Sequence, residues 1–299
     1  MKRRIFISHT KDRVLNQKQL TFKNALIEKI KEDGYIPEIF SISGNADRLS
    51  WSFDNVEKVM GNCCGAIIIA FPRWSFSNDS NDVIKMPSEY SHYEGAIALK
   101  NKLPTLIIAE DSTLRRGIID MGGGRSITFM NEDPNEDYIN EKKFKKDYSA
   151  WLEDVKNRYD VFLGYCSKSK SVAGAIQLFL QNDLHVKVMD WSKGFTTGES
   201  ILDQIERASL ICSSGIFLFT KDDIIPLKGS EFNTAPRDNV IFETGYFINS
   251  KGKSRVLIIV EKGAKIPADI GGHIYVSLED REKINNIETN IRSFIENNF

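Results

Sequence analysis

The sequence predicts an α/β protein made of two similar domains, each with a mostly parallel sheet flanked by helices. Its 299 residues are twice the usual length of about 150 residues for one domain. Short β-branched or aromatic runs alternate with amphipathic stretches along the chain, which is typical of βα units. The elements of the first half also recur in the same order in the second half, which indicates an internal repeat.

Each element of the first half follows from a local pattern. The apolar run Ile5-Phe-Ile7 predicts the first strand. The helical pattern that follows it ends at Gly34. A polar loop at Gly44 and Asn45 separates the second strand from a short helix. The strands are expected at residues 4–8, 35–40, 64–71, 104–109 and 126–130, and the helices at 17–33, 52–61 and 88–101.

The second half repeats these patterns. Strands are expected at residues 161–165, 186–189, 215–220, 255–260 and 273–276, and helices at 171–180, 199–208, 240–249 and from 279 to the end. Gly65 and Gly215 are 150 residues apart, Ile107 and Ile258 are 151 apart, and Glu94 and Glu243 are 149 apart. The nearly constant offset predicts a first domain at 1–134, a helical linker at 135–158 and a second domain at 159–299.

Composition and charge restrict the class of function. A hydrophobic fraction of 41% and a charged fraction of 27% are typical of a folded globular protein. The net charge of −1 excludes the broad basic field of a nonspecific nucleic-acid binder. No apolar run approaches the roughly 20 residues of a membrane span, so we expect a cytoplasmic protein without membrane contact. A small ligand or a protein partner is favoured.

Metal and disulfide chemistry are not expected. The four cysteines, Cys63, Cys64, Cys166 and Cys212, lie in or next to apolar runs without a Cys-x-x-Cys spacing. We therefore expect buried free thiols. The four histidines show no metal-ligand spacing with one another or with cysteine, so no metal or cofactor is expected. Residues Gly122 to Gly124 lack the Lys-Ser/Thr pair of a phosphate loop, and we interpret them as a turn.

Each repeat carries a glutamate early in the helix after its third strand, Glu94 in the first half and Glu243 in the second. In a parallel sheet this position lies near the carboxyl edge, where ligands bind. A carboxylate there can bind ribose hydroxyls and stabilise the positive charge that develops as an N-glycosidic bond breaks. Helix-dipole stabilisation is an equally simple alternative, and the flanking aromatic residues favour a site.

The second half resembles the TIR-like nucleotide-binding domains of bacterial antiphage systems, the group fused to cyclic-nucleotide sensors. The similarity covers about residues 160–280 through the motifs GESILDQIE at 198–206, GIFLFTKDD at 215–223, PRDNVIFETGYF at 236–247 and IPADIGG at 266–272. The first half resembles the TIR superfamily more loosely, through Phe6-Ile-Ser-His9 and Ser88-x-Tyr90-Ser91-x-x-Glu94.

The resemblance implies a flavodoxin-like fold, cleavage of NAD⁺ as substrate, and activation by assembly through loops at residues 41–49 and 191–197. It implies Glu243 as the catalytic residue of the second half and Glu94 as that of the first. The substrate-binding residues that we expect from the motifs are Asp222, Asp223, Arg237, Asn239, Ser88, Tyr90, Ser91 and His9.

The chain departs from the family pattern in two places. The first strand of the second half continues as Phe162-Leu-Gly-Tyr-Cys-Ser-Lys-Ser169 instead of a His-Gly-like turn, and Ser167 and Lys168 are our candidates for phosphate binding there. Residues 73–87 form a longer, more polar insert than a compact domain needs, which predicts a lid, a partner surface or disorder.

Together these features predict an NAD⁺ glycohydrolase that acts as an antiphage effector, assembles as a homo-oligomer and responds to assembly or to a nucleotide messenger. The alternative is a protein that binds a nucleotide messenger without cleaving it and signals to a partner. A nucleoside deoxyribosyltransferase, which shares the βα layout and a carboxylate, is a third and weaker hypothesis.

Overall fold

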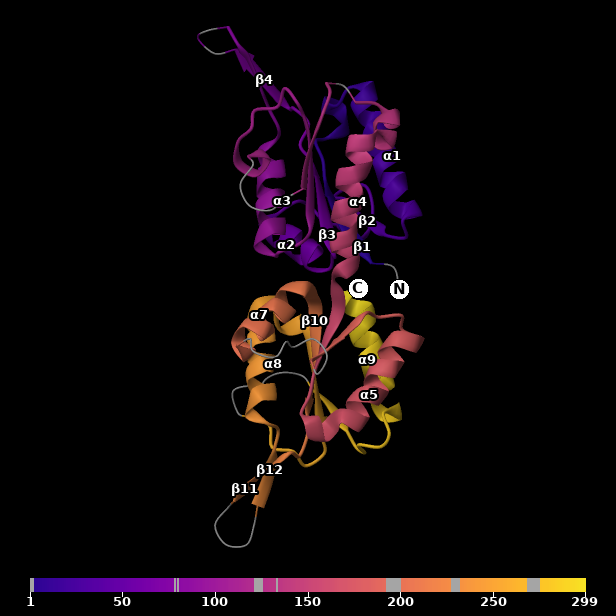
Figure 1. The fold of residues 1–299 in the computed structure, drawn as a ribbon, viewed down its shortest axis with the longest axis vertical. Coiled ribbons are helices and arrows are strands. Elements are labelled where there is room, and N and C mark those ends of the chain that lie inside the picture. Colours follow the sequence, from indigo (N-terminus) through magenta and orange to yellow (C-terminus); the bar gives the residue numbers. More distant parts are fainter. Residues whose placement is uncertain are drawn as a thin grey trace. The chain divides into compact units, whose positions relative to one another are not determined.

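The computed structural model describes residues 3–77, 79, 81–120, 126–132, 134–191, 200–226, 232–267 and 275–299. These residues form two compact units, one at Lys2–Asn157 and the other at Arg158–Phe299 (Figure 1). The two are called here the N-terminal and the C-terminal unit. Each contains one five-stranded sheet with only parallel pairs, which confirms the predicted α/β fold class with two flavodoxin-like domains.

The sheet of the N-terminal unit has the strand order β2-β1-β3-β6-β7. Its strands are β1 Arg4–Ser8, β2 Ile36–Glu38, β3 Gly65–Ile69, β6 Thr105–Glu110 and β7 Ser126–Met130, and its helices are α1 Gln17–Glu32, α2 Phe53–Gly61, α3 Glu89–Lys100 and α4 Lys142–Asn157. Helices cover both faces of the sheet, so β3 and β6 are buried along their whole length.

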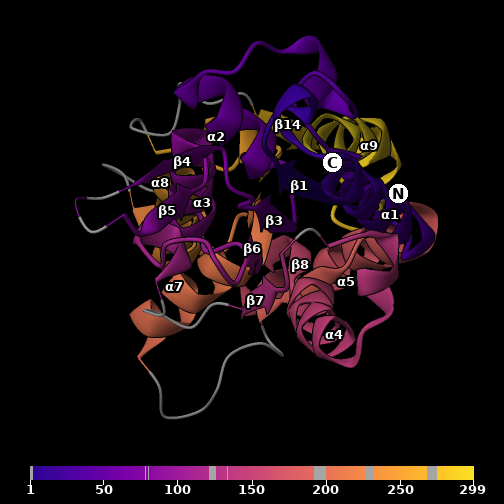
Figure 2. The same cartoon turned by 90° about the horizontal axis from the view of Figure 1, so that it is seen from above.

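Two helix pairs enclose this sheet. Helices α1 and α4 cover one face through Phe22 and Trp151, whereas α2 and α3 cover the other through Val56 and Ala98 (Figures 1 and 2). The amino end of α1 is fixed by a capping box, in which Asn16 and Gln19 each bond the backbone N–H of the other.

The C-terminal unit repeats this arrangement with the strand order β14-β13-β10-β8-β9. Its strands are β8 Tyr159–Gly164, β9 Val188–Asp190, β10 Cys212–Phe219, β13 Val256–Glu261 and β14 Tyr275–Leu278, and its helices are α5 Lys170–Leu178, α7 Ile201–Ile211, α8 Asp238–Lys251 and α9 Asn285–Asn298. Helix α5 continues into a π-helical turn at Phe179–Asp183. Helices α5 and α9 cover one face, and α7 and α8 the other.

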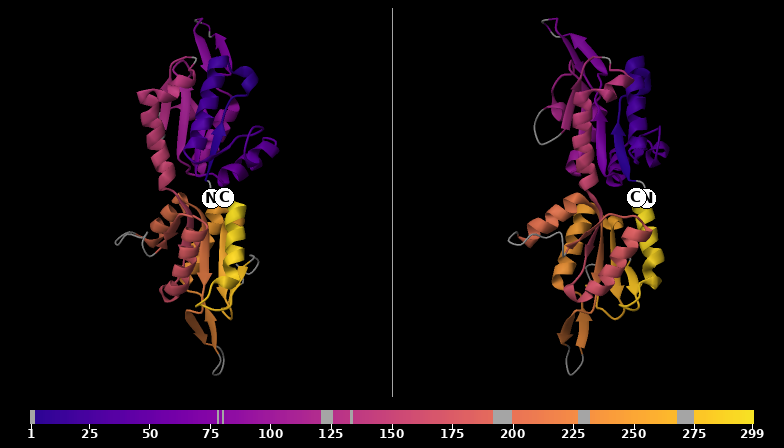
Figure 3. Two further views of the ribbon diagram at one scale, coloured as in Figure 1. Left: turned by 90° about the vertical axis from the view of Figure 1, so that its right-hand side faces the viewer. Right: turned by 45° about the vertical axis from the view of Figure 1, so that its right-hand side comes forward.

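Each unit also carries a two-stranded antiparallel hairpin that the sequence did not predict. The first is β4 Trp74–Ser77 with β5 Val83–Met86, and the second is β11 Asp223–Pro226 with β12 Phe232–Ala235. Each projects beyond the sheet of its own unit (Figure 3). The first hairpin occupies the insert at residues 73–87, so its described part is ordered, and the second lies 149 residues later in an equivalent place.

Residues 135–157 of the segment 135–158, which was predicted as a helical linker, are part of the N-terminal unit instead. They contain a 3₁₀ turn at Glu136–Asn140 followed by α4. The aromatic face of this helix lies in the buried cluster of the sheet, and the Trp151 indole N–H donates to the Pro104 carbonyl oxygen at 3.0 Å. The unit boundary therefore falls at residues 157 and 158.

The four cysteines are buried free thiols, as the sequence predicts. Among the described residues, no helix combines the length and the hydropathy that crossing a membrane would require. The described part of the chain also holds no group of His, Cys, Asp or Glu side chains that could bind a metal ion.

We expect Trp151→Ala to lower the free energy of unfolding of the N-terminal unit by about 3–5 kcal/mol, because it empties a buried site and removes one of the two donors to the Pro104 carbonyl. Urea denaturation measures the loss. The matched control is Trp74→Ala, since Trp74 is half exposed in the first hairpin and its removal should change stability by about 0.5 kcal/mol or less. Equal effects of the two substitutions would contradict the placement of α4.

Candidate functional site

The two glutamates singled out in the sequence lie in equivalent places. Glu94 is on α3 and Glu243 on α8, each on the helix that follows the third strand and the hairpin of its unit. Both side chains are buried, each residue being only 6% exposed. Buried carboxylates are rare and costly unless they are paired or take part in chemistry, so both positions require an explanation.

The carboxylate of Glu243 faces the carboxyl end of β8. A Cβ atom added to Gly164, the last residue of that strand, would lie 3.0 Å from Glu243 Oε2 and 2.5 Å from a ring carbon of Phe217. A glycine at this position therefore gives the carboxylate room to approach the strand. This glycine belongs to the segment where the sequence departs from the family pattern.

One carboxylate oxygen of Glu243 makes no hydrogen bond to the described residues. This oxygen, Oε2, is buried. Burial alone raises the pKa of Glu243 to about 7, because desolvation disfavours the charged form. The group therefore titrates near neutral pH, and a ligand with a hydroxyl donor or a developing positive charge would supply the missing interaction.

One oxygen of the corresponding carboxylate in the N-terminal unit accepts a hydrogen bond. The Trp51 indole N–H donates to Glu94 Oε1 at 2.7 Å. Burial raises the pKa of Glu94 to about 7, and the Ser8 hydroxyl and the Trp51 indole N–H oppose this rise. The two glutamates thus share position and burial but differ in what their oxygens contact.

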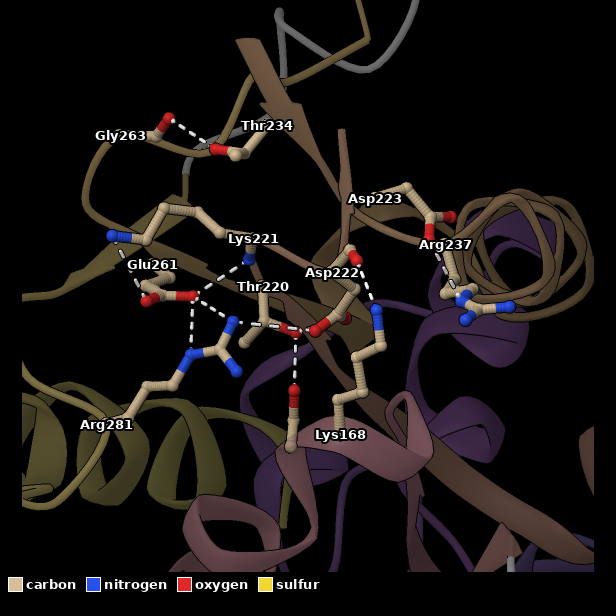
Figure 4. Close-up of polar contacts among 11 residues, drawn as sticks. Lys168, Thr220, Lys221, Asp222, Asp223, Thr234, Arg237, Glu261, Gly263 and Arg281 are labelled. Carbon is tan, nitrogen blue, oxygen red and sulfur yellow. Dashed lines mark hydrogen bonds and ion pairs between the residues drawn. The ribbon is translucent and has the colours of Figure 1, made fainter. Parts of the chain in front are cut away.

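Two of the expected substrate-binding residues of the C-terminal unit belong to a polar network at the carboxyl ends of the strands (Figure 4). The Lys168 ammonium donates to the backbone carbonyl of Asp222 at 2.6 Å, and the Asp222 carboxylate accepts from the Thr220 hydroxyl at 2.5 Å. Arg281 lies 3.4 Å from the same carboxylate. Asp222 and Lys168 therefore have structural partners in this state.

Arg281 and Glu261 complete the network, and sequence reasoning missed both. The Arg281 guanidinium contacts Glu261 Oε2 at 2.6 and 2.8 Å, and the Lys221 backbone N–H donates to the same oxygen. The repeat could have indicated Glu261. It is the last residue of β13, and Glu110, 151 residues earlier, is the last residue of the equivalent strand β6. Glu110 is also paired, with the Gln19 side chain at 2.6 Å.

The remaining candidates of the C-terminal unit lie at its surface. Asp223 and Arg237 form an ion pair at 3.2 Å in which both side chains are nearly half exposed. Asn239, in the first turn of α8, and Ser167, in the 3₁₀ turn after β8, are both exposed. The expected assembly loop at 191–197 lies outside the described residues except for Trp191, as do residues Gly122 to Gly124 and His273.

The serines of the N-terminal motif shape the start of α3. Ser88 is the N-cap residue, and its hydroxyl accepts from the Ser91 backbone N–H at 3.2 Å. The Ser88 and Ser91 hydroxyls lie 3.1 Å apart, and both residues are buried. These two residues therefore fix the helix that carries Glu94, whereas Tyr90 is exposed on the same helix.

His9 follows β1, and its side chain hydrogen-bonds the backbone of the next residue. Its Nδ1–H donates to the Thr10 carbonyl oxygen at 2.6 Å, and burial lowers the pKa of the imidazole. The loop after β2 is anchored by the buried carboxylate of Glu38, which accepts from Arg4 and from the Ala46 backbone N–H. Gly44 in this loop has φ +73°, a conformation that favours glycine.

Comparison with known proteins agrees with the expected resemblance of the C-terminal unit. Residues 160–280 match the model of the TIR domain of CAP12/Pycsar effector proteins. The CD-NTase-associated protein 12 of Flavobacterium daejeonense is 35% identical over 113 residues, which are 38% of this chain and 35% of that protein. The same protein of Sphingobacterium faecium is 30% identical over 112 residues, 38% of this chain and 34% of that protein.

A third relative gives a longer match. The Pycsar effector protein BcPycTIR of Burkholderia cepacia is 30% identical over 142 residues, 45% of this chain and 46% of that protein. The chain thus matches less than half of the length of each of these relatives. The similarity of residues 160–280 to TIR domains is confirmed, and the N-terminal unit lies outside the matched family model.

We expect Glu243→Gln to stabilise the protein more at pH 8 than at pH 5. The folded-state pKa of about 7 exceeds the ordinary value of 4.5, so the stability contributed by the protonated carboxyl is complete below about pH 4.5 and is lost as the pH rises through 7. Glutamine does not titrate, so its advantage should grow by about 2 kcal/mol between pH 5 and pH 8. Thermal unfolding at both pH values measures this, with Glu206→Gln as the control at an exposed site of the same unit. A pH-independent effect of Glu243→Gln would contradict the burial argument.

Proposed function

We propose that the protein is an NAD⁺ glycohydrolase whose C-terminal unit cleaves the nicotinamide N-glycosidic bond, and that it acts as an antiphage effector. The observation that carries the proposal is the buried Glu243 carboxylate oxygen without a partner among the described residues, next to the end of a central strand. The match of residues 160–280 to the TIR domain of CAP12/Pycsar effector proteins supports the assignment.

The proposed chemistry needs one carboxylate. When the bond between ribose C1′ and the nicotinamide nitrogen breaks, the bonding electron pair moves to that nitrogen, and nicotinamide leaves neutral without accepting a proton. Positive charge develops on the ribose, where ionised Glu243 stabilises it in a surrounding of low polarity. A water molecule then forms the new C1′–O bond and loses a proton, giving ADP-ribose.

The exposed polar groups near this carboxylate would bind the rest of the dinucleotide. Ser167, at the start of the 3₁₀ turn after β8, is exposed, and Lys168 next to it has an exposed side chain although its ammonium holds the Asp222 carbonyl. Arg237 and Asn239 lie at the start of α8 on the same unit. The polar network around Arg281 fixes the strand ends from which these residues extend.

Regulation is part of the proposal. We propose that assembly into a homo-oligomer, or binding of a nucleotide messenger, converts the protein to its active state. The similarity to proteins named as CD-NTase-associated and Pycsar effectors supports a response to such a messenger. Nicotinamide release from NAD⁺ is therefore measured on concentrated protein, with and without cyclic mononucleotides and dinucleotides.

We expect Glu243→Gln to lower nicotinamide release from NAD⁺ by at least about 100-fold, because the neutral amide cannot stabilise the developing positive charge. Chromatography of the reaction mixture measures free nicotinamide and ADP-ribose. The matched control is Glu94→Gln, the equivalent change in the N-terminal unit, which should leave the rate within about threefold because Glu94 contacts Trp51. Loss of activity in Glu94→Gln with retention in Glu243→Gln would place the reaction in the other unit.

We expect the rate to rise with pH and to level off above neutrality. Only the ionised carboxylate stabilises the transition state, and burial raises the pKa of Glu243 to about 7, so the half-maximal rate should fall near pH 7 instead of near 4.5. A profile of kcat against pH from 5 to 9 tests this. A flat profile across that range would contradict the role of Glu243.

A further inference from the structure

The hairpin of the N-terminal unit has one apolar face. In an antiparallel pair, opposite residues carry their side chains on the same face, and alternate residues along a strand share that face. The register pairs Trp74 with Met86 and Phe76 with Ile84, so these four side chains lie together. We call them the apolar hairpin face. The opposite face carries two serines, a valine and a lysine, namely Ser75, Ser77, Val83 and Lys85.

The apolar hairpin face is open to solvent at its two rings. Trp74 and Phe76 are 50% and 48% exposed, and Ile84 and Met86 are half-buried. The hairpin projects beyond the sheet of its unit (Figure 3), and it forms a separate two-stranded sheet. A two-stranded ribbon is at best marginally stable in water, so a partner that covered this face would stabilise both strands.

Contacts at the base of the hairpin orient Trp74. The Arg73 guanidinium lies 4.8 Å from the centroid of the Trp74 ring, and the indole N–H donates to the Glu89 carboxylate at 3.4 Å. Arg73 and Glu89 are themselves 3.8 Å apart. A ring held in this way loses little conformational freedom when another surface packs on it, which lowers the cost of association.

The second hairpin does not repeat this pattern in its described part. There Asp223 lies opposite Ala235, and Ile224 lies opposite Thr234. Each of these pairs joins an apolar side chain to a polar one, so neither face is apolar at these positions. The shared fold therefore does not require an apolar face on its hairpin, and the first hairpin carries one for another reason.

We infer that two copies of the chain associate through their apolar hairpin faces, packed face to face with the two hairpins antiparallel. The charges of the hairpin favour this orientation. Asp79 and Asp82 are exposed near the tip, whereas Arg73 and Lys85 near the base are each paired with a glutamate. Two tips side by side would bring four carboxylates together. The antiparallel orientation instead places each acidic tip beside the nearly neutral base of the other copy.

The size of the face predicts a weak dimer. An aromatic side chain buries about 150–250 Å² at most, and the two rings of this face are already half covered in a single copy. With the flanking isoleucine and methionine, the contact falls below the roughly 1,200 Å² of a stable interface and belongs to the transient class. We therefore expect a dissociation constant between about 10 μM and 1 mM.

Such a dimer forms when the protein is concentrated, as activation by assembly requires. The inference specifies a surface for the proposed homo-oligomer and rests on the proposed function only for its regulatory role. Its test contains no NAD⁺ and measures mass alone. A chain that stays monomeric contradicts the hairpin dimer, whereas a failure to release nicotinamide contradicts the proposed function.

The test is sedimentation equilibrium of the full chain from about 5 μM to 1 mM. We expect the average mass to rise from that of one chain toward that of two. Phe76→Asp should raise the dissociation constant at least about tenfold, because it places an unpaired charge in the apolar contact. The matched control is Ser75→Asp, which puts the same charge on the neighbouring residue of the opposite face and should change the constant less than about threefold.

Two further variants test the face and the orientation. Val83→Ala removes an exposed apolar side chain from the opposite face and should leave the dimer unchanged within about threefold. Asp79→Asn should also change the constant less than about threefold, because the tips lie apart in the antiparallel dimer. In a parallel dimer the same substitution would relieve repulsion and strengthen association. Thermal unfolding verifies that each variant is folded.

Four outcomes would overturn the inference. The first is a mass of one chain throughout the concentration range. The second is an equal effect of Phe76→Asp and Ser75→Asp, or none of either, which would place any association on another surface. The third is a gain of about tenfold or more in Asp79→Asn, which would contradict the antiparallel orientation. The fourth is a monomeric chain that binds phosphatidylcholine vesicles and loses this binding in Phe76→Asp, which would make the face a lipid contact.

Discussion

A carboxylate buried beside the carboxyl edge of a parallel sheet is the constraint on which the rest of each unit depends. Desolvating a carboxylate is costly, so the surrounding residues must either pair it, neutralise it or leave it for a ligand. Glu94 is paired with Trp51, and Glu243 has a free oxygen among the described residues. The glycine at position 164 leaves room for the Glu243 carboxylate, because a Cβ atom there would clash with Phe217 and lie in close contact with Glu243 Oε2.

The polar network around Arg281 pairs the charges at this edge of the C-terminal unit. Glu261 ends β13 and Asp222 follows β10, so two carboxylates meet where neighbouring strands end. Arg281, from the segment before α9, contacts both and offsets their repulsion. With these charges paired to one another, Glu243 remains the acidic group at the sheet edge whose oxygen lacks a partner in the described part of the unit.

Much of the fold could be predicted from the sequence because the buried strands are continuous apolar runs and the two halves share one spacing. The hairpins were not predicted, since strands such as Trp74–Ser77 have only four residues and are exposed on both sides, so that no buried apolar run marks them. The role of α4 was missed because its lysines obscured a face formed by Phe144, Tyr148 and Trp151. Glu243 and Glu94 were found from their place in the repeat, but the partner of Glu94 lies 43 residues away in the chain.

The two units differ in the residues that lie against the buried glutamate. Trp51 lies next to Ser52, the N-cap of α2, and the corresponding N-cap of the C-terminal unit is Ser200, before α7. The Trp51 indole N–H donates to Glu94 Oε1, whereas Glu243 Oε2 has no hydrogen-bond partner among the described residues. Two copies of one fold can in this way keep the same buried carboxylate for different purposes. In one it anchors an indole, and in the other, under the proposed function, it binds the ribose of a substrate.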